Sequence, residues 1–178
     1  MAYVVLGLLI AVGPQTVYSL NKFFEAGISL FYAASLGAQR QALQRLLADG
    51  LVTVTEEHDG GRAKKVYAVT AEGRSAFQDW MLGPITDRDL EVAALSRLYF
   101  LGALPSPAER RTVLEHIAQR AAEDEARLEA LAAMIDGAEV PEQYRELVRY
   151  QRLTVEYGLR THGLGRTFFS ELAEAERD

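Results

Sequence analysis

The stretch 35–70 constrains the fold of this chain most strongly, because its periodicity changes from helical to strand-like at one glycine. Leucines recur at helical spacing from Leu36 to Leu47, and the pattern stops at Gly50, where a left-handed C-cap favours glycine. Two strand-like runs follow at 51–57 and 64–70, separated by a turn that contains Gly60-Gly61. Helix, glycine stop and β-hairpin with a basic tip are the outline of a winged helix-turn-helix.

The composition is that of an ordinary soluble globular protein, with 49% apolar and 25% charged residues in 178. The chain has no cysteine, which excludes disulfides and thiolate zinc sites and suits a reducing cytoplasm. The apolar run 3–12 is too short for a membrane span, which needs about 20 residues. No basic segment precedes this run, so we expect a first core helix rather than a signal peptide, and a cytoplasmic protein without a membrane partner.

The Gly83-Pro84 pair is the predicted domain boundary. Residues 1–82 read as three helices, the hairpin and a fourth helix that Thr70 caps, and residues 83–178 read as helical throughout. The predicted fold is therefore mainly α with a small β-hairpin wing. Lys/Arg and Asp/Glu number seven each in 1–82, against twelve and eighteen in the rest, so the acidic excess lies in the helical part.

The longest predicted helix, 106–136, carries apolar residues at three-four heptad spacing, which favours pairing between two copies of the chain. The expected homodimer interface comprises Leu114, Ile117, Ala121, Leu128, Leu131 and Ile135. A last helix begins near Glu142. Three glycines in its later half, Gly158, Gly163 and Gly165, predict a kink or local fraying there.

The helix that begins after Ser35, its predicted N-cap, is the candidate reading element for double-stranded DNA. In a helix-turn-helix the second helix enters the major groove, where Arg pairs with guanine and Gln with adenine. The expected DNA contacts on this helix are Ser35, Gln39, Arg40, Gln41, Gln44 and Arg45, and those of the wing are Arg62, Lys64 and Lys65. The competing interpretation of the helix is an ordinary solvent-exposed face. For the hairpin it is a charged, soluble loop, because Glu56, Glu57 and Asp59 reduce the local positive charge.

Three aromatic residues are candidates to line a small-molecule pocket between the winged-helix part and the helical part. Phe31, Tyr32 and Trp80 are the expected effector-binding residues. Aromatics at such positions are more often part of a core, so this assignment competes with simple packing.

Residues 3–82 resemble the PadR family of bacterial winged-helix regulators. The segments that carry the resemblance are YVVLGLLIAVGPQTVYSL (3–20), SLGAQRQALQRLLADGLV (35–52) and GGRAKKVYAVTAEGRSAFQDWM (60–81). The resemblance implies a homodimeric transcriptional repressor that binds an inverted repeat and is released by a small effector, with phenolic acids as the family's namesake ligands. This chain departs from the family pattern at Thr16-Val17, where His-Gly is usual, and at 39–41, where the usual tyrosine is missing.

Two other functions are weighed against the same sequence features, a protein-binding module and an enzyme. The altered reading helix and the acidic balance would also suit a winged-helix module that binds proteins and not DNA. An enzyme is disfavoured, because the histidines at 58, 116 and 162 fall in three different elements and no nucleophile motif or phosphate loop is present. We therefore expect no catalytic residue, no metal and no cofactor.

Overall fold

The computed structural model describes residues 1–59 and 62–176, and the chain divides into two compact units, Met1–Glu109 and Arg110–Asp178. Helices dominate both units, and a two-stranded antiparallel hairpin is the sheet of the described residues. This is the predicted class of fold, mainly α with a β-hairpin wing. The Gly60-Gly61 turn lies outside the described residues.

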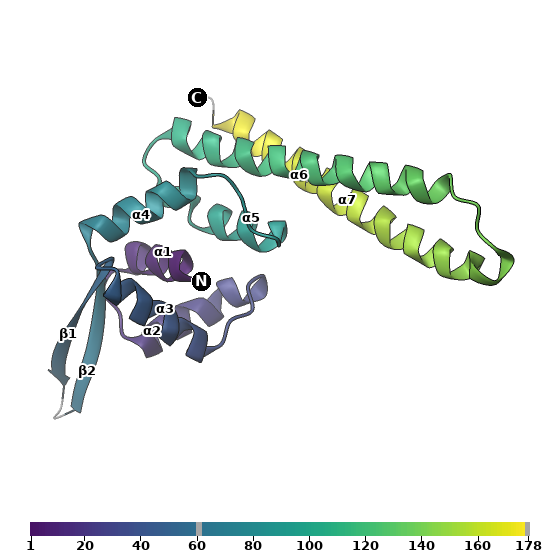
Figure 1. Ribbon diagram of the computed structural model, residues 1–178. Helices are drawn as coiled ribbons and strands as arrows, with labels where there is room; N and C mark the ends of the chain where they lie inside the picture. The colour runs from purple at the N-terminus through teal and green to yellow at the C-terminus, as the bar shows by residue number, and fades with distance from the viewer. Residues whose placement is uncertain (60–61, 177–178) are drawn as a thin grey trace. The chain divides into compact units, whose positions relative to one another are not determined.

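Helix α1 (Ala2–Val12) is the centre of the first unit (Figure 1). It is apolar on nearly all sides, and its buried residues include Val5, Leu6 and Leu9. A helix of this kind is stable only when other elements cover it. Accordingly α1 contacts α2 (Val17–Ala26), α3 (Leu36–Ala48), the hairpin and α4 (Ala71–Leu82).

Side-chain caps define where the two helices of the helix-turn-helix begin. The Thr16 hydroxyl accepts a hydrogen bond from the Ser19 amide at 3.1 Å, and the Ser35 hydroxyl accepts one from the Ala38 amide at 3.2 Å. Each cap satisfies a backbone N–H group that the helix itself leaves without a partner. The predicted N-cap at Ser35 is confirmed, and a short 3₁₀ turn, η1 (Ile28–Leu30), lies between the two helices.

The wing consists of β1 (Val52–Asp59) and β2 (Arg62–Val69), which pair in register from Val52 with Val69 to Asp59 with Arg62. Gly50 adopts a φ of 69° between α3 and β1, as the sequence predicted. Gln15 adds a third short segment, since its backbone exchanges two hydrogen bonds with Tyr67. The strands extend two residues further toward the turn than the predicted runs 51–57 and 64–70, because cross-strand pairing continues to Asp59 and Arg62.

Helix α4 leads into α5 (Leu90–Tyr99) and a 3₁₀ turn, η2 (Leu101–Ala103), which complete the first unit. Thr70 caps α4 as predicted, and its hydroxyl also donates to the Gly50 carbonyl at 2.9 Å. A Cβ atom at Gly7 would lie 2.9 Å from the Phe100 ring, so α1 is in close contact with the end of α5. The predicted boundary at Gly83-Pro84 therefore falls inside the first compact unit.

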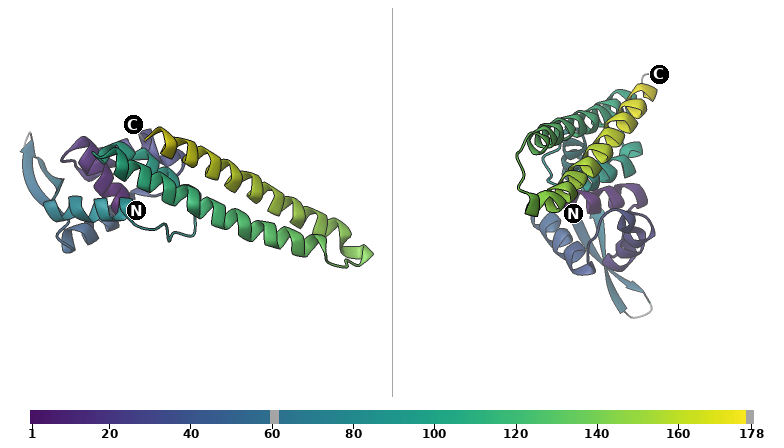
Figure 2. Two further views of the ribbon diagram at one scale, coloured as in Figure 1. Left: turned by 90° about the horizontal axis from the view of Figure 1, so that it is seen from above. Right: turned by 90° about the vertical axis from the view of Figure 1, so that its right-hand side faces the viewer.

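The second unit is a hairpin of two long helices, α6 (Pro107–Asp136) and α7 (Arg145–Ala175), linked through a 3₁₀ turn, η3 (Glu142–Tyr144). Figure 2 shows the two helices side by side in opposite directions. Ion pairs among the described residues join this hairpin: Arg110 to Glu176 at 2.8 Å, Arg166 to Glu125 at 2.7 Å and Arg152 to Asp136 at 3.0 Å.

The predicted fraying of the last helix is wrong, because α7 is helical without interruption from Arg145 to Ala175. Its glycines face α6 instead. A Cβ atom at Gly158 would lie 2.8 Å from a Leu128 methyl carbon, and one at Gly163 would lie 2.9 Å from a Glu125 carboxylate oxygen. Tertiary packing thus outweighs the low helix propensity of glycine.

No helix among residues 1–59 and 62–176 is long and apolar enough to cross a bilayer. Within the same residues, no three His, Cys, Asp or Glu side chains come together in a group that could hold a metal ion.

Candidate nucleic-acid interface

The outer face of α3 is polar and free of core contacts. Arg40, Gln41, Gln44 and Arg45 are all exposed, and they begin one turn after the Ser35 cap. Because the helix N-terminus carries unpaired N–H groups and a partial positive charge, this end favours an anionic partner such as a phosphate group. Of the six residues predicted to contact DNA from this helix, five are exposed: Ser35 at its start, then Arg40, Gln41, Gln44 and Arg45.

The expectation that Gln39 belongs to this face is wrong. Its side chain is only 1% exposed, and it lies on the same stripe of α3 as buried Ala42, Leu43 and Leu46. Residues three and four apart share a helix face, so Gln39 turns inward with the leucines although it is polar. Its Nε2 donates a hydrogen bond to Asn21 Oδ1 at 3.0 Å.

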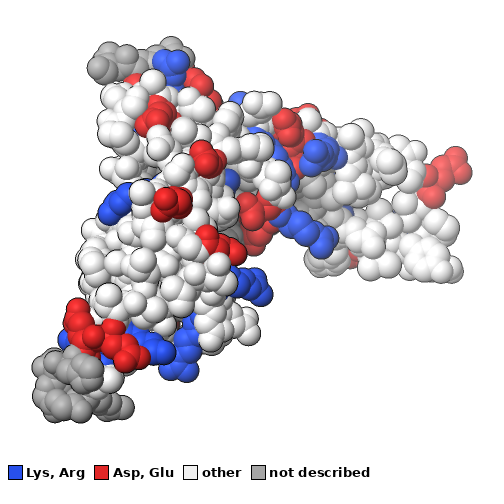
Figure 3. All heavy atoms as spheres, turned by 60° about the vertical axis from the view of Figure 1, so that its left-hand side comes forward, with Lys and Arg blue, Asp and Glu red and all other residues white. Residues whose placement is uncertain are grey.

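The cations of the wing are opposed by acids across the hairpin. Lys65 pairs in register with Glu56, and Lys64 pairs with Glu57, whose carboxylate lies 3.6 Å from the Lys64 Nζ. Figure 3 shows red and blue side chains gathered together next to the grey tip of the wing. Arg62 is placed in β2 by its backbone pairing, but its side chain lies outside the described part of the structure. The wing thus offers little net positive charge in its described residues.

Helix α2 also presents an exposed cation. Lys22 lies over the Tyr18 ring with its Nζ 4.9 Å from the ring centroid, and Tyr18 is 66% exposed. Residues four apart on a helix are neighbours, which places the Lys22 ammonium over the Tyr18 ring.

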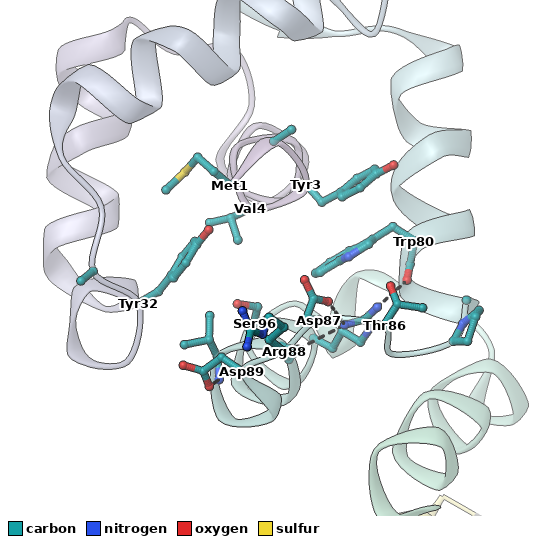
Figure 4. A pocket seen from close by; sticks show the side chains of 17 residues that line it. Met1, Tyr3, Val4, Tyr32, Trp80, Thr86, Asp87, Arg88, Asp89 and Ser96 are labelled. Atoms are coloured by element: carbon teal, nitrogen blue, oxygen red, sulfur yellow. Dashed lines mark hydrogen bonds and ion pairs between the residues drawn. The ribbon is translucent and has the colours of Figure 1, made fainter. Parts of the chain in front are cut away.

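A cavity of about 800 Å³ lies within the first unit, between the start of α1, the 83–89 loop and α5. Figure 4 shows Tyr3, Tyr32 and Trp80 around the same space. The structure therefore brings together two of the three predicted effector residues. Phe31 does not line the cavity and packs against Tyr99 instead, with ring centroids 6.2 Å apart.

Arg97 forms one wall of this cavity and was missed from the sequence. Its side chain is 2% exposed, with its guanidinium carbon 4.5 Å above the Trp80 ring. The Tyr3 ring stacks at 5.2 Å on the same indole. Asp87 Oδ2 is 3.9 Å from the guanidinium, and Arg97 Nε is buried without a hydrogen-bond partner.

The charge state of the cavity follows from this burial. Desolvation lowers the pKa of the Arg97 guanidinium from its ordinary value, and the Asp87 carboxylate acts in the opposite direction. Burial, followed by the same carboxylate, raises the pKa of the Tyr32 phenol, which keeps it neutral. The cavity wall is thus a neutral phenol beside a buried cation that lacks a full set of partners.

The predicted dimer residues of α6 are largely used inside the chain. Leu114, Ile117 and Ala121 are buried, Leu128 and Ile135 are half-buried, and Leu131 is 40% exposed. Helix α7 carries the exposed apolar seam instead. Its members are all exposed: Leu147, Tyr150, Thr154, Tyr157, Thr161, Leu164 and Phe168. The five that are not threonine are between 44% and 73% exposed.

A family model matches residues 5–79, and its description is "Transcriptional regulator PadR-like family". Residues 5–79 are therefore similar to a PadR-like domain. The match covers α1 to α4, including the reading helix and the wing, and it confirms the resemblance seen in the sequence. The family that residues 5–79 match is one of transcriptional regulators.

Several solved structures align with nearly the whole chain at low sequence identity and low TM-score. Bacillus subtilis PadR in complex with operator DNA is 18% identical over 98% of both chains, with a TM-score of 0.43. The PadR-like regulator BC1756 from Bacillus cereus is 22% identical over 99% of this chain and 95% of its own, with a TM-score of 0.43. The Vibrio cholerae virulence activator AphA is 23% identical over 98% and 97%, with a TM-score of 0.40. No curated protein matches the sequence.

Proposed function

We propose that this PadR-like protein acts as a dimeric repressor, which binds an inverted-repeat operator and is released from it by a small aromatic effector. The observation that carries the proposal is the exposed polar face of α3 within a domain that matches a family of transcriptional regulators. Arg40 and Arg45 would contact guanine or phosphate, and Gln41 and Gln44 would contact adenine.

The wing takes a smaller part in this proposal than the sequence suggested. Glu56 and Glu57 oppose Lys65 and Lys64, so the wing would add phosphate contacts only weakly. Lys22 on α2 is better placed to contribute, because no acidic side chain is paired with it in the described structure and Tyr18 supports it. We therefore assign DNA affinity mainly to α2 and α3.

The proposed dimer uses the α7 seam and a second copy of this chain. The positions 147, 150, 154, 157, 161, 164 and 168 follow a strict three-four spacing over the length of the helix, and all are exposed. Such spacing is typical of helices that pair with one another. Exposed tyrosines and leucines in one row are also the kind of apolar surface that a partner normally covers. The two PadR-like domains of such a dimer would contact half-sites about 34 Å apart on one side of the duplex.

The proposed effector site is the cavity beside Trp80. Tyr3 and Tyr32 supply aromatic walls, and the Arg97 Nε lacks an acceptor that an effector carboxylate would provide. Asp87 is 3.9 Å from the guanidinium, so this contact is long and an incoming anion would compete with it. Binding would change the packing of the 83–89 loop on the PadR-like domain and so weaken operator binding.

One experiment tests DNA binding. Genomic fragments retained by the purified protein are sequenced, and the best-retained fragment is titrated beside a shuffled fragment of equal composition. We expect a shared inverted repeat and a clear preference for the selected fragment. If no fragment is retained even at low salt, the protein is not a DNA-binding regulator. The opposed charges of the wing would then favour the protein-binding module.

A second experiment tests the effector site. Trp80 is the single tryptophan of the chain, so its fluorescence reports directly on the cavity. We expect aromatic carboxylic acids to change this fluorescence and to release the selected DNA fragment, and the matching neutral amides to do neither. Equal responses to acids and amides would show that Arg97 does not recognise the ligand.

A further inference from the structure

Gln39 is polar yet buried, and its position in the helix-turn-helix is unusual. The residue is 1% exposed, whereas the next residue, Arg40, is on the exposed face. The Gln39 Nε2 atom donates to Asn21 Oδ1 at 3.0 Å, which connects α3 to α2. No other side-chain hydrogen bond joins these two helices in the part of the chain that the structure describes.

This arrangement is not the most stable one available to the position. The Gln39 Oε1 atom is buried without a hydrogen-bond partner. A buried acceptor without a partner is destabilising, and a leucine of similar size would avoid the penalty. Packing alone therefore does not account for a glutamine among Ala42, Leu43 and Leu46.

A hydrogen bond differs from apolar packing in that it has a direction. Leucines on α3 would still pack on α1 and α2 if α3 rotated by a small angle about its own axis. The Asn21–Gln39 hydrogen bond would break in that case, since it needs a short distance and a near-linear geometry. The residues whose direction depends on this rotation are Arg40, Gln41, Gln44 and Arg45.

We infer that Gln39 is a positioning residue: its hydrogen bond to Asn21 fixes the rotation of α3 and thereby the sequence discrimination of the DNA-reading face. The inference rests on the proposed DNA-binding function. Contacts to base edges require placement to within about 0.5 Å, whereas long cationic side chains reach phosphates over a wider range. Loss of the bond should therefore reduce discrimination more than it reduces binding to DNA of any sequence.

Three variants test the inference. Gln39→Leu removes both the hydrogen bond and the buried acceptor that has no partner. Asn21→Ala removes the same hydrogen bond by changing its other partner, the half-buried Asn21. The exchange variant Asn21→Gln with Gln39→Asn keeps the same two amides in reversed order. Gln119→Leu, at an exposed site on α6, is the matched control. The probes are the genomic fragment best retained by the wild-type protein and its shuffled permutation, titrated at one salt concentration.

We expect Gln39→Leu and Asn21→Ala each to lower the ratio of the two affinities about tenfold, the cost of one good base contact, while affinity for the shuffled fragment changes little. The exchange variant should recover most of the ratio, which a merely structural role would not predict. Thermal unfolding should show Gln39→Leu at least as stable as the wild type. If Gln39→Leu does not fold, Asn21→Ala and the exchange variant decide the outcome.

Two results would overturn the inference. Unchanged discrimination in both single variants would show that the bond has no role in positioning. A loss in Gln39→Leu but not in Asn21→Ala would show that Gln39 turns outward and contacts DNA itself. A wild-type protein that does not distinguish the two fragments would instead refute the proposed function, and this inference with it.

Discussion

Helices α3 and α7 both present a long exposed face, but the two faces differ completely in chemistry. The face of α3 consists of Arg and Gln side chains, whereas the seam of α7 consists of tyrosine, leucine and phenylalanine with two threonines. A polar, cationic face suits a hydrated and charged partner, and an apolar row suits the matching row of another protein chain. Under the proposed function, α3 in the first unit recognises DNA and α7 in the second unit pairs two copies of the chain.

Charges introduced into the α7 seam should have the largest effect. Tyr157→Glu combined with Leu164→Glu places two carboxylates where the dimer must exclude water, which costs several kcal/mol and should weaken association more than about a hundredfold. Light scattering should then give the mass of a single chain. Operator affinity should fall strongly, because a single chain brings only one PadR-like domain to the operator. Ser170→Glu, exposed on another side of α7, is the control. A dimer that survives the double change would place the interface elsewhere.

Salt should separate the two faces. If binding neutralises four phosphates, raising salt from 0.1 to 0.3 M should lower DNA affinity about fiftyfold, since each released counterion contributes to the slope. Self-association through the apolar seam should change little over the same range. Fluorescence anisotropy and analytical ultracentrifugation measure the two constants. A dimer that dissociates with salt as steeply as the DNA complex would contradict the division.

Removal of the α3 cations should affect DNA alone. Arg40→Ala combined with Arg45→Ala should lower operator affinity about tenfold to thirtyfold, because each arginine supplies one strong contact worth about 1 kcal/mol or more. The molecular mass in solution should remain that of the wild type. Arg127→Ala, exposed on α6, serves as the control. Wild-type affinity in the double variant would exclude α3 as the reading element.

The smallest expected change concerns the wing. Glu57→Gln removes the acid that opposes Lys64, and DNA affinity should rise about twofold to threefold, as expected for an exposed ion pair of less than about 1 kcal/mol. Glu72→Gln on α4 removes an acid outside the hairpin and should change DNA affinity less. A loss of affinity in Glu57→Gln would indicate that the carboxylate orders the wing rather than weakening it.

Much of the PadR-like domain could be read from the sequence, because its signals are local. The caps at Ser35 and Thr70 and the left-handed Gly50 each depend on a few neighbouring residues, and all three are as predicted. The prediction for Gln39 is wrong because a polar residue type suggests an exposed position, whereas the helical spacing gives a buried one. Its distance of four residues from Leu43 puts it on the buried stripe whatever its polarity.

The helical unit was harder to interpret for a different reason. A heptad pattern shows that a helix pairs with another, but it does not say whether that helix belongs to the same chain. Leu114, Ile117 and Ala121 meet their partners within the chain, so the surface available to a second copy lies on α7. The prediction for Gly158 fails for the same reason. This glycine allows a close approach of α7 to Leu128 on α6, a residue that is distant in sequence.

Arg97 marks the limit of sequence reasoning in the first unit. An arginine in the middle of an amphipathic helix normally faces solvent, and nothing nearby in the sequence predicts its burial under Trp80. The pairing depends on α4 and α5 being brought together through α1, which is a tertiary event.

The geometry of α7 restricts how this protein can change in length. Its glycines meet α6 on one side while the row of large exposed side chains occupies another. That row repeats every seven residues, and Gly158 and Gly165 are also seven residues apart. Because each residue turns the helix by about 100°, deleting one residue near Leu159 would swing everything beyond it away from both partners at once. Insertions of seven residues would preserve both rows. Natural relatives with longer or shorter arms should therefore differ in steps of whole heptads, a rule that sequencing of new members can check without any biochemistry.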